Sequence, residues 1–179
     1  MNLLNKTRVY LIGGMQNFQN GDSWRREIKQ ELQEMNITCF DPYIKPFINE
    51  IKEDHDARKL LLEWMENEEY SKVEERMKAV RSDDLRLCDI SDFGIAYIHP
   101  KIASWGSAEE IFWMNRLKKP IFIIVEGGKK QIPLWLLGML PHKYFYNSVD
   151  EVVAVLKNIN CGEKPMDSSR FRLLKEDCR

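Results

Sequence analysis

The sequence predicts an α/β protein built on a doubly wound, mostly parallel five-stranded sheet with helices on both faces. Three observations carry this prediction. Short apolar runs alternate along the chain with longer segments of helical periodicity. One of these runs, 120–125, holds no polar residue, as expected for a central parallel strand covered on both faces. The chain has 179 residues, and a single domain usually has about 100–200.

Each element follows from a local pattern. The expected strands are short apolar runs bounded by glycine, proline or polar turns, and they span 9–12, 37–40, 93–98, 120–125 and 143–146. The expected helices span 23–36, 107–118, 133–140 and 149–158, with two more inside 46–89 that break near 67–71. Because crossovers between parallel strands are right-handed, few topologies remain, and we expect the flavodoxin-like strand order 2-1-3-4-5.

The chain is expected to hold one domain and a short extension. Residues 1–159 contain all the predicted elements and form the α/β domain. Residues 160–179 follow as a C-terminal extension, in which Gly162 and Pro165 interrupt regular structure. This extension is either a loose tail or a segment that docks on a neighbouring subunit.

The composition excludes several classes of protein. Hydrophobic residues make up 44% of the chain and the net charge is -1, so a mostly disordered chain is excluded. The 27 basic and 28 acidic residues argue against a stable nucleic-acid partner, which would favour a basic excess. Four cysteines without a CxxC pair and three scattered histidines predict neither a metal site nor a disulfide scaffold. No cofactor is expected.

The chain shows no sign of a membrane partner. Its first residues are polar and lack the apolar core of a signal peptide. The longest apolar run, 120–125, is far shorter than the about 20 residues that a membrane-spanning helix needs. Together with the cysteine usage, this predicts a cytoplasmic protein with reduced thiols.

Three loops are expected to meet at the carboxyl edge of the sheet, where open α/β sheets bind ligands. They begin near Gly13, Asp41 and His99. Gly13 and Gly14, followed by Met15, would let a ligand approach the backbone closely. This loop lacks both the dinucleotide-binding pattern GxGxxG and the nucleotide-binding pattern GxxxxGK[ST], and a plain turn explains it equally well.

The segment 104–111 joins a strand end to a helix start, where backbone N–H groups favour anions. Glu110 in this segment would face the same crevice as an ionised carboxylate, which is the state that a nucleophile needs. A structural interpretation competes. Ser107-x-x-Glu110 is also a capping box, with Ser107 as the N-cap and Glu110 at the third helical position. The sequence leaves both interpretations open.

Further acidic and aromatic residues could belong to the same crevice. Asp84 falls late in a predicted helix, and Asp92 immediately precedes the strand at 93–98. Two carboxylates facing one crevice indicate glycosidic chemistry, with one as nucleophile and the other as general acid. A solvated helix surface and a turn would explain the same two aspartates. Trp24 and Trp105 could either stack on a base or pack in the core or its rim.

Three motifs between about residues 8 and 126 carry a resemblance to a known family. They are Tyr10-Leu11-Ile12-Gly13-Gly14-Met15 leading to Gly21-Asp22-Ser23-Trp24-Arg25, then Asp84-Leu85-x-x-Cys88-x-x-x-Asp92, then Ser104-x-Gly106-x-x-x-Glu110-Ile111 followed by Lys119-Pro120. In order and spacing the chain resembles the nucleoside 2-deoxyribosyltransferases, whose superfamily includes the deoxynucleoside 5′-monophosphate N-glycosidases. The first loop and the long charged segment 46–82 depart from the family pattern.

The resemblance implies a retaining N-glycosidic-bond enzyme that acts on a (deoxy)nucleoside or its 5′-monophosphate, with transfer to another base or to water. Glu110 aligns with the family's nucleophilic glutamate, and Asp84 with the aspartate that handles protons or positions the sugar. Ser104 stands where the transferases commonly have an aspartate and the monophosphate hydrolases a serine near the phosphate. It therefore favours a monophosphate substrate, because a neutral serine does not repel phosphate.

The remaining expected substrate contacts are Gly13, Gly14, Met15, Trp24, Arg25, Asp41, Asp92, Trp105 and Gly106. The resemblance also implies a homo-oligomer in which a neighbouring subunit completes the site. Two other functions remain open on the residues alone. One is a non-catalytic nucleotide-binding or sensing module of the same fold, in which Glu110 only caps its helix. The other is a structural or interaction domain that binds no nucleotide.

Overall fold

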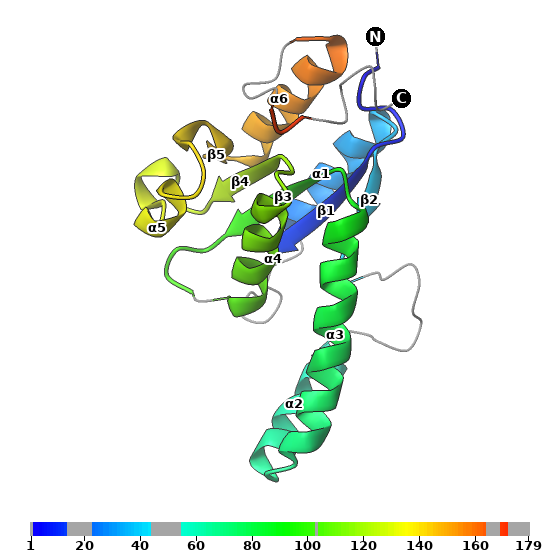
Figure 1. Ribbon diagram of the computed structural model, residues 1–179, viewed down its shortest axis with the longest axis vertical. Coiled ribbons are helices and arrows are strands. Elements are labelled where there is room, and N and C mark those ends of the chain that lie inside the picture. Colours follow the sequence, from blue (N-terminus) through cyan, green and yellow to red (C-terminus); the bar gives the residue numbers. More distant parts are fainter. Residues whose placement is uncertain (1, 14–22, 44–54, 103, 164–168, 172–179) are drawn as a thin grey trace.

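The computed structural model describes residues 2–13, 23–43, 55–102, 104–163 and 169–171 (Figure 1). Five strands form one sheet in the order β2-β1-β3-β4-β5, and all neighbouring strands are parallel. The strands are β1 (Arg8–Gly13), β2 (Thr38–Phe40), β3 (Phe93–Ile98), β4 (Ile121–Val125) and β5 (Phe145–Tyr146). The expected fold class and strand order are confirmed.

Helices cover both faces of the sheet (Figure 1). The α-helices are α1 (Ser23–Glu34), α2 (His55–Glu66), α3 (Tyr70–Ile90), α4 (Trp105–Arg116), α5 (Leu134–Leu137) and α6 (Val149–Cys161). Two 3-10 turns, η1 (Lys129–Gln131) and η2 (His142–Tyr144), complete the described elements. α1 and α6 pack on one face, and α3, α4 and α5 pack on the other. In the described part of the chain, no helix has the length and apolar character needed to cross a membrane.

The sheet separates two hydrophobic cores because side chains alternate along a strand. In β1, Val9 and Leu11 point into the core under α1 and α6. Tyr10 and Ile12 point into the core under α3 and α4. This alternation brings the phenol of Tyr10 to the α4 side of the sheet.

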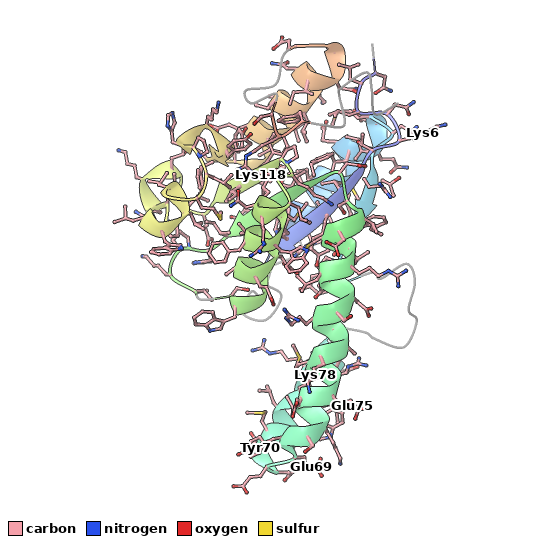
Figure 2. The ribbon with its side chains drawn as sticks, viewed as in Figure 1. Lys6, Glu69, Tyr70, Glu75, Lys78 and Lys118 are labelled. Carbon is pink, nitrogen blue, oxygen red and sulfur yellow. The ribbon has the colours of Figure 1, made fainter. Side chains whose placement is uncertain are left out.

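α2 and α3 form a helical hairpin whose far end projects away from the sheet (Figure 1). The break between them falls at 67–69, inside the predicted interval, and Glu68 adopts a left-handed φ of 57° there. Toward its C-terminal end, α3 packs against the sheet and buries Leu87 and Cys88. Toward its other end it exposes Tyr70 (Figure 2). The last turns of α3 therefore lie beside the sheet, and its first turns extend beyond the sheet.

Some element boundaries differ from the predictions. α5 covers only 134–137 of the expected 133–140, and the strand expected at 143–146 is replaced by η2 and the two residues of β5. α6 continues past the predicted end to Cys161, where Gly162 has a φ of 105° and terminates the helix. These ends depend on local turn geometry, which apolar periodicity does not encode.

Two residues of the C-terminal extension pack on the chain's own core. Phe171 is buried edge-on against Phe122, with ring centroids 6.1 Å apart. Arg170 donates from Nη2 to Asn115 Oδ1 at 2.8 Å, and its guanidinium lies 5.6 Å from the ring centre of Tyr144. At these two residues the extension docks on its own domain. Residues 164–168 and 172–179 lie outside the described residues.

Candidate active site

A cavity of about 840 Å³ opens at the carboxyl edge of the sheet. Its walls come from the ends of β1 and β3, the segment after β3, the first turns of α4, and parts of α3 and α5. Small-molecule sites typically measure about 300–1,000 Å³, and in open α/β sheets they lie at this edge. The cavity therefore has the size and position of a ligand site.

Glu110 reaches this cavity from the second turn of α4. The residue is only 8% exposed, and Tyr10 Oη donates to Glu110 Oε1 at 2.8 Å. The capping-box interpretation is wrong because α4 begins at Trp105, two residues earlier than expected. Ser104 is the N-cap residue, with extended backbone angles, and its Oγ donates to Ser107 Oγ at 2.9 Å. Glu110 thus lies beyond the reach of the helix start and belongs to the cavity.

Tyr10 begins the first sequence motif, but the sequence analysis gives it no role in the site. It is fully buried, and burial together with the negative charges of Glu110 and Asp84 raises the pKa of its phenol well above the ordinary value. The phenol therefore stays protonated and acts as a donor. A tyrosine inside an otherwise aliphatic strand was the available signal, because a buried hydroxyl needs a hydrogen-bond partner.

Asp84 lines the same cavity from α3 and is 9% exposed. A solvated helix surface is therefore the wrong interpretation for this aspartate. Its neighbour one turn later, Cys88, is buried on the same helix. Burial, followed by the charges of Glu110 and Asp84, raises the pKa of the Cys88 thiol. The two carboxylates thus act on the same two groups, Tyr10 and Cys88, which places them in one electrostatic environment.

Of the residues expected in the first loop and its surroundings, Gly13 lines the cavity. Gly14 and Met15 lie outside the described residues. Trp24, Arg25 and Asp41 are buried behind the end of β1 and are not among the residues that line the cavity. They support its wall instead of contacting its interior.

The start of α4 forms the mouth of the cavity. Ser104, Trp105 and Gly106 all line it, and Trp105 is 86% exposed, which excludes a core role for this side chain. Trp135 of α5 also lines the mouth and is 81% exposed. The sequence patterns do not indicate Trp135, because its place depends on how the chain returns to the sheet after β4.

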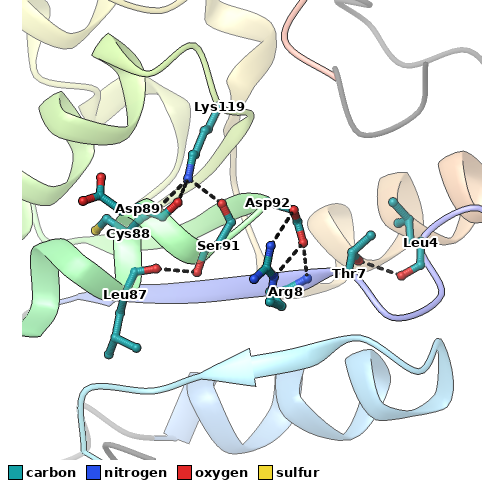
Figure 3. A network of polar contacts seen from close by, with 9 residues as sticks. All are labelled: Leu4, Thr7, Arg8, Leu87, Cys88, Asp89, Ser91, Asp92 and Lys119. Carbon is teal, nitrogen blue, oxygen red and sulfur yellow. Dashed lines mark hydrogen bonds and ion pairs between the residues drawn. The ribbon is translucent and has the colours of Figure 1, made fainter. Parts of the chain in front are cut away.

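Asp92 lies at the opposite edge of the sheet. It precedes β3, so it sits at the amino end of that strand. There its Oδ2 accepts from the backbone N of Arg8 at 2.7 Å and lies 3.3 Å from Arg8 Nε (Figure 3). The expectation that Asp92 contacts the substrate is therefore corrected: its place in the fold separates it from the cavity.

Several basic side chains also line the cavity, and two of them contact carboxylates. Arg81 forms an ion pair with Glu109, and His99 Nε2 contacts the carboxylate of Glu126. Lys101 lies on the segment after β3. Among the described residues, no group of three or more His, Cys, Asp and Glu side chains is arranged to hold a metal ion.

These features define a class of site: a parallel α/β sheet with two buried carboxylates in one cavity at its carboxyl edge. A carboxylate held by a phenol can attack an electrophilic carbon, and a second carboxyl group can transfer a proton. The arrangement is suited to cleaving a glycosidic bond.

A solved structure shares this fold. The 2-deoxyribosyltransferase of the psychrotolerant bacterium Bacillus psychrosaccharolyticus superimposes with a TM-score of 0.54, covering 84% of this chain and 96% of that chain at 17% sequence identity. The CMP N-glycosidase of Clostridium botulinum gives a TM-score of 0.47, covering 84% of this chain and 98% of that one at 15% identity. No family model and no curated protein matches the sequence. The first likeness shows that this chain has the fold of a 2-deoxyribosyltransferase.

Proposed function

We propose that the protein is a retaining N-glycosidic-bond enzyme that acts on a (deoxy)nucleoside or its 5′-monophosphate. One observation carries the proposal: Glu110, buried and hydrogen-bonded to Tyr10, shares a cavity at the carboxyl edge of the sheet with Asp84. The fold likeness to a 2-deoxyribosyltransferase supports it.

In the first step, the carboxylate of Glu110 attacks C1′ of the sugar, and the bond from C1′ to the base nitrogen breaks. The base leaves with the bonding electron pair and takes a proton from the carboxylic acid of Asp84. Tyr10 holds the attacking carboxylate in place through its hydrogen bond. The product of this step is a glycosyl ester of Glu110.

In the second step, water or a second base attacks C1′ from the opposite face of the sugar. The Asp84 carboxylate, deprotonated by the first step, takes the proton of the nucleophile, and Glu110 leaves as a carboxylate. Two inversions at C1′ retain its configuration. Attack by water makes the protein a hydrolase, and attack by a base makes it a transferase.

The start of α4 favours a monophosphate as the substrate. Ser104 is the N-cap of this helix and lines the cavity, so backbone N–H groups and the positive end of the helix dipole lie near it. Ser104 and Ser107 carry no charge that would repel phosphate, and both line the cavity. Lys101 adds a positive charge on the preceding segment.

Liquid chromatography of base release and base exchange tests the proposal. Deoxynucleosides, ribonucleosides and their 5′-monophosphates are each incubated with and without a second free base. We expect Glu110→Gln to lose at least about 10³-fold in kcat, since it removes the nucleophile. Glu75→Gln is the matched control, because Glu75 is exposed on the hairpin (Figure 2).

The outcomes separate the candidate functions. Base release from monophosphates alone defines a nucleotide hydrolase, and exchange that requires the second base defines a transferase. Mass spectrometry of the acid-quenched enzyme is expected to find a glycosyl group on the peptide that holds Glu110. Nucleotide binding without turnover would contradict the proposal and indicate a binding or sensing module.

A further inference from the structure

An ion pair joins α3 to α4 at the wall of the cavity. Arg81 lies on α3 and Glu109 on α4, and both residues line the cavity. Arg81 Nε donates to Glu109 Oε1 at 3.0 Å and to Oε2 at 2.8 Å, and Nη2 also donates to Oε1. The guanidinium fork thus holds both oxygens of one carboxylate.

This ion pair is accessible to water. The side chain of Arg81 is 58% exposed and that of Glu109 is 37% exposed. The hydrogen bonds from Arg81 lower the pKa of the Glu109 carboxyl, so this group is an anion at neutral pH. Exposed ion pairs contribute little to stability, because water replaces either partner at little cost. The fork is therefore occupied, but another anion can take the place of Glu109.

The ion pair lies next to the two proposed catalytic carboxyl groups. Arg81 precedes Asp84 by about one turn of α3, and both line the cavity from that helix. Glu109 directly precedes Glu110, but Glu110 is 8% exposed, whereas the side chain of Glu109 is 37% exposed. Glu109 is therefore nearer the mouth of the cavity than Glu110. A substrate whose C1′ contacts Glu110 can reach the ion pair with another of its groups.

The space beside the ion pair is open toward the start of α4. Helical side chains lean toward the N-terminus of their helix, so Glu109 leans over the first turn, which Trp105 begins. At Gly106 in that turn, a Cβ atom would meet no heavy atom of the described residues within 4 Å, apart from its chain neighbours and the helix backbone. An anion at the Arg81 fork thus has room, and the positive end of the helix dipole favours it.

The charges of the cavity wall explain why the partner of Arg81 matters. Among the described lining residues, three carboxyl groups accompany two side chains that are cations at neutral pH; these residues are Asp84, Glu109 and Glu110, and Arg81 and Lys101. Ionised carboxylates repel an anionic substrate. Glu109 has no part in the proposed reaction, yet it occupies the guanidinium that such a substrate would need.

A guanidinium fork binds phosphate in the same bidentate geometry in which it binds a carboxylate. A phosphate monoester carries a charge of about −1.5 to −2 at neutral pH, compared with −1 for a carboxylate. A phosphate that its bound sugar holds at the fork therefore competes well with Glu109. The displaced carboxylate is already partly exposed and is hydrated by water instead.

We propose that Arg81 is the specificity-determining residue for the phosphate group of the substrate, and that Glu109 occupies its fork until a phosphate monoester replaces it. The inference rests on the proposed function and deepens it, because it names the side chains that distinguish a 5′-monophosphate from its nucleoside. Arg81 acts on binding, whereas Glu110 and Asp84 carry the chemistry.

Two substitutions with opposite consequences test the pair. The quantity measured is the ratio of kcat/KM for a 5′-monophosphate to kcat/KM for its nucleoside. We expect Arg81→Met to lower this ratio about 10- to 100-fold, because it removes hydrogen bonds to a charged group. We expect Glu109→Gln to raise the ratio about 2- to 5-fold, because it removes a competing anion of an exposed pair. Changes in the same direction, or a constant ratio in both variants, would overturn the proposal and leave a structural ion pair.

Two further variants test the geometry and supply the control. Arg81→Lys keeps the charge but loses the fork, so we expect the ratio to lie between those of R81M and the wild type. An R81K ratio equal to that of the wild type would contradict recognition by the fork. Arg86→Met is the matched control, because Arg86 is exposed on the same helix and is not among the residues that line the cavity. A fall in R86M as large as that in R81M would reduce the effect to a general loss of positive charge.

Binding without turnover tests the source of the phosphate. Isothermal titration calorimetry compares 2-deoxyribose 5-phosphate, 2-deoxyribose and inorganic phosphate. We expect 2-deoxyribose 5-phosphate to bind most tightly, about 10- to 100-fold more weakly in R81M and about 2- to 5-fold more tightly in E109Q. Inorganic phosphate that binds as tightly as the sugar phosphate, with the same response to both variants, would indicate a site for free anions and overturn the assignment to the substrate.

The two assays separate failure of this inference from failure of the proposed function. Binding of 2-deoxyribose 5-phosphate that depends on Arg81, in a protein that releases no base, would sustain the role of Arg81 and reject the enzyme. Base release with the same substrate ratio in R81M, E109Q and the wild type would sustain the enzyme and reject the role of Arg81.

Discussion

The two edges of the sheet differ in how their polar and charged groups are paired. At the amino edge, opposite charges and dipoles meet: Lys119 Nζ donates to the carbonyl oxygens of Cys88, Asp89 and Ser91, and Asp92 pairs with Arg8 (Figure 3). The contacts of Lys119 satisfy carbonyl groups at the end of α3 that have no partner within the helix.

At the carboxyl edge, two carboxyl groups share one cavity instead. Glu110 and Asp84 are both buried in one cavity, and the phenol of Tyr10 donates to Glu110. Two carboxylates in a poorly solvated space cost stability unless they serve another purpose. Polar groups at the amino edge are therefore paired in a way that adds stability, whereas those at the carboxyl edge have the mismatch typical of a reactive site.

The same substitution at both edges is the strongest test of this contrast. We expect Asp84→Asn to lower kcat about 10²- to 10⁴-fold, because it removes the proposed general acid and base. Asp92→Asn should leave kcat near the wild-type value and lower the free energy of unfolding by only about 0–1 kcal/mol, because its ion pair with Arg8 is partly solvated. Base-release kinetics and urea denaturation measure the two effects. Equal losses of kcat in both variants would contradict the comparison.

Tyr10→Phe tests the role of the phenol at the carboxyl edge. It removes the hydrogen bond to Glu110 and keeps the packing of the ring. A hydrogen bond to a charged group is worth about 1.5–3 kcal/mol, so we expect kcat/KM to fall about 10- to 100-fold. The acid limb of the pH profile of kcat/KM should also move to higher pH, because the lost hydrogen-bond donor favoured the ionised form of Glu110.

A pH–rate series checks this expectation for Tyr10. The matched control is Tyr70→Phe, at an exposed tyrosine on α3 (Figure 2). If Y10F keeps the wild-type profile, the hydrogen bond has no part in catalysis.

Lys119→Met probes the amino edge alone. The substitution removes three charge-assisted contacts to backbone carbonyls, and we expect the free energy of unfolding to fall by about 1–3 kcal/mol. Activity per folded molecule should not change. Urea denaturation measures the loss, with exposed Lys118→Met as the control (Figure 2). A large loss of kcat in K119M at unchanged stability would contradict the view that the amino edge serves stability and the carboxyl edge serves catalysis.

The smallest expected effect concerns the half-buried thiol of Cys39 on β2. Burial raises the pKa of Cys39 to about 12 from its ordinary value of 9.0. The folded chain therefore holds a proton that the unfolded chain releases, so this contribution to stability is present below pH 9 and is lost as pH rises toward about 12.

Cys39→Ala should consequently lose stability less steeply than the wild type above pH 9, although it is less stable at neutral pH. Chemical denaturation at several alkaline pH values measures the two slopes. The difference between the curves isolates Cys39 from the other buried groups, and parallel curves would show that its ionisation does not limit alkaline stability.

Local sequence patterns were enough to predict the fold and the edge of the sheet at which the cavity lies. Local apolar runs and helical periodicity locate the five strands, because burial on both faces requires such runs. The rule that ligands bind at the carboxyl edge then directs attention to Gly13, Ser104 and Glu110, which all line the cavity.

The contacts of individual side chains depend instead on how distant elements pack together. Tyr10 and Glu110 are separated by 100 positions, and no local pattern encodes their hydrogen bond. A helix start displaced by two residues removed Glu110 from a capping box, and packing placed Arg25 and Asp41 behind the wall instead of inside the cavity. The physical reason is that periodicity specifies which face of an element is buried, whereas the partner of a buried polar group depends on elements that meet only in the folded chain.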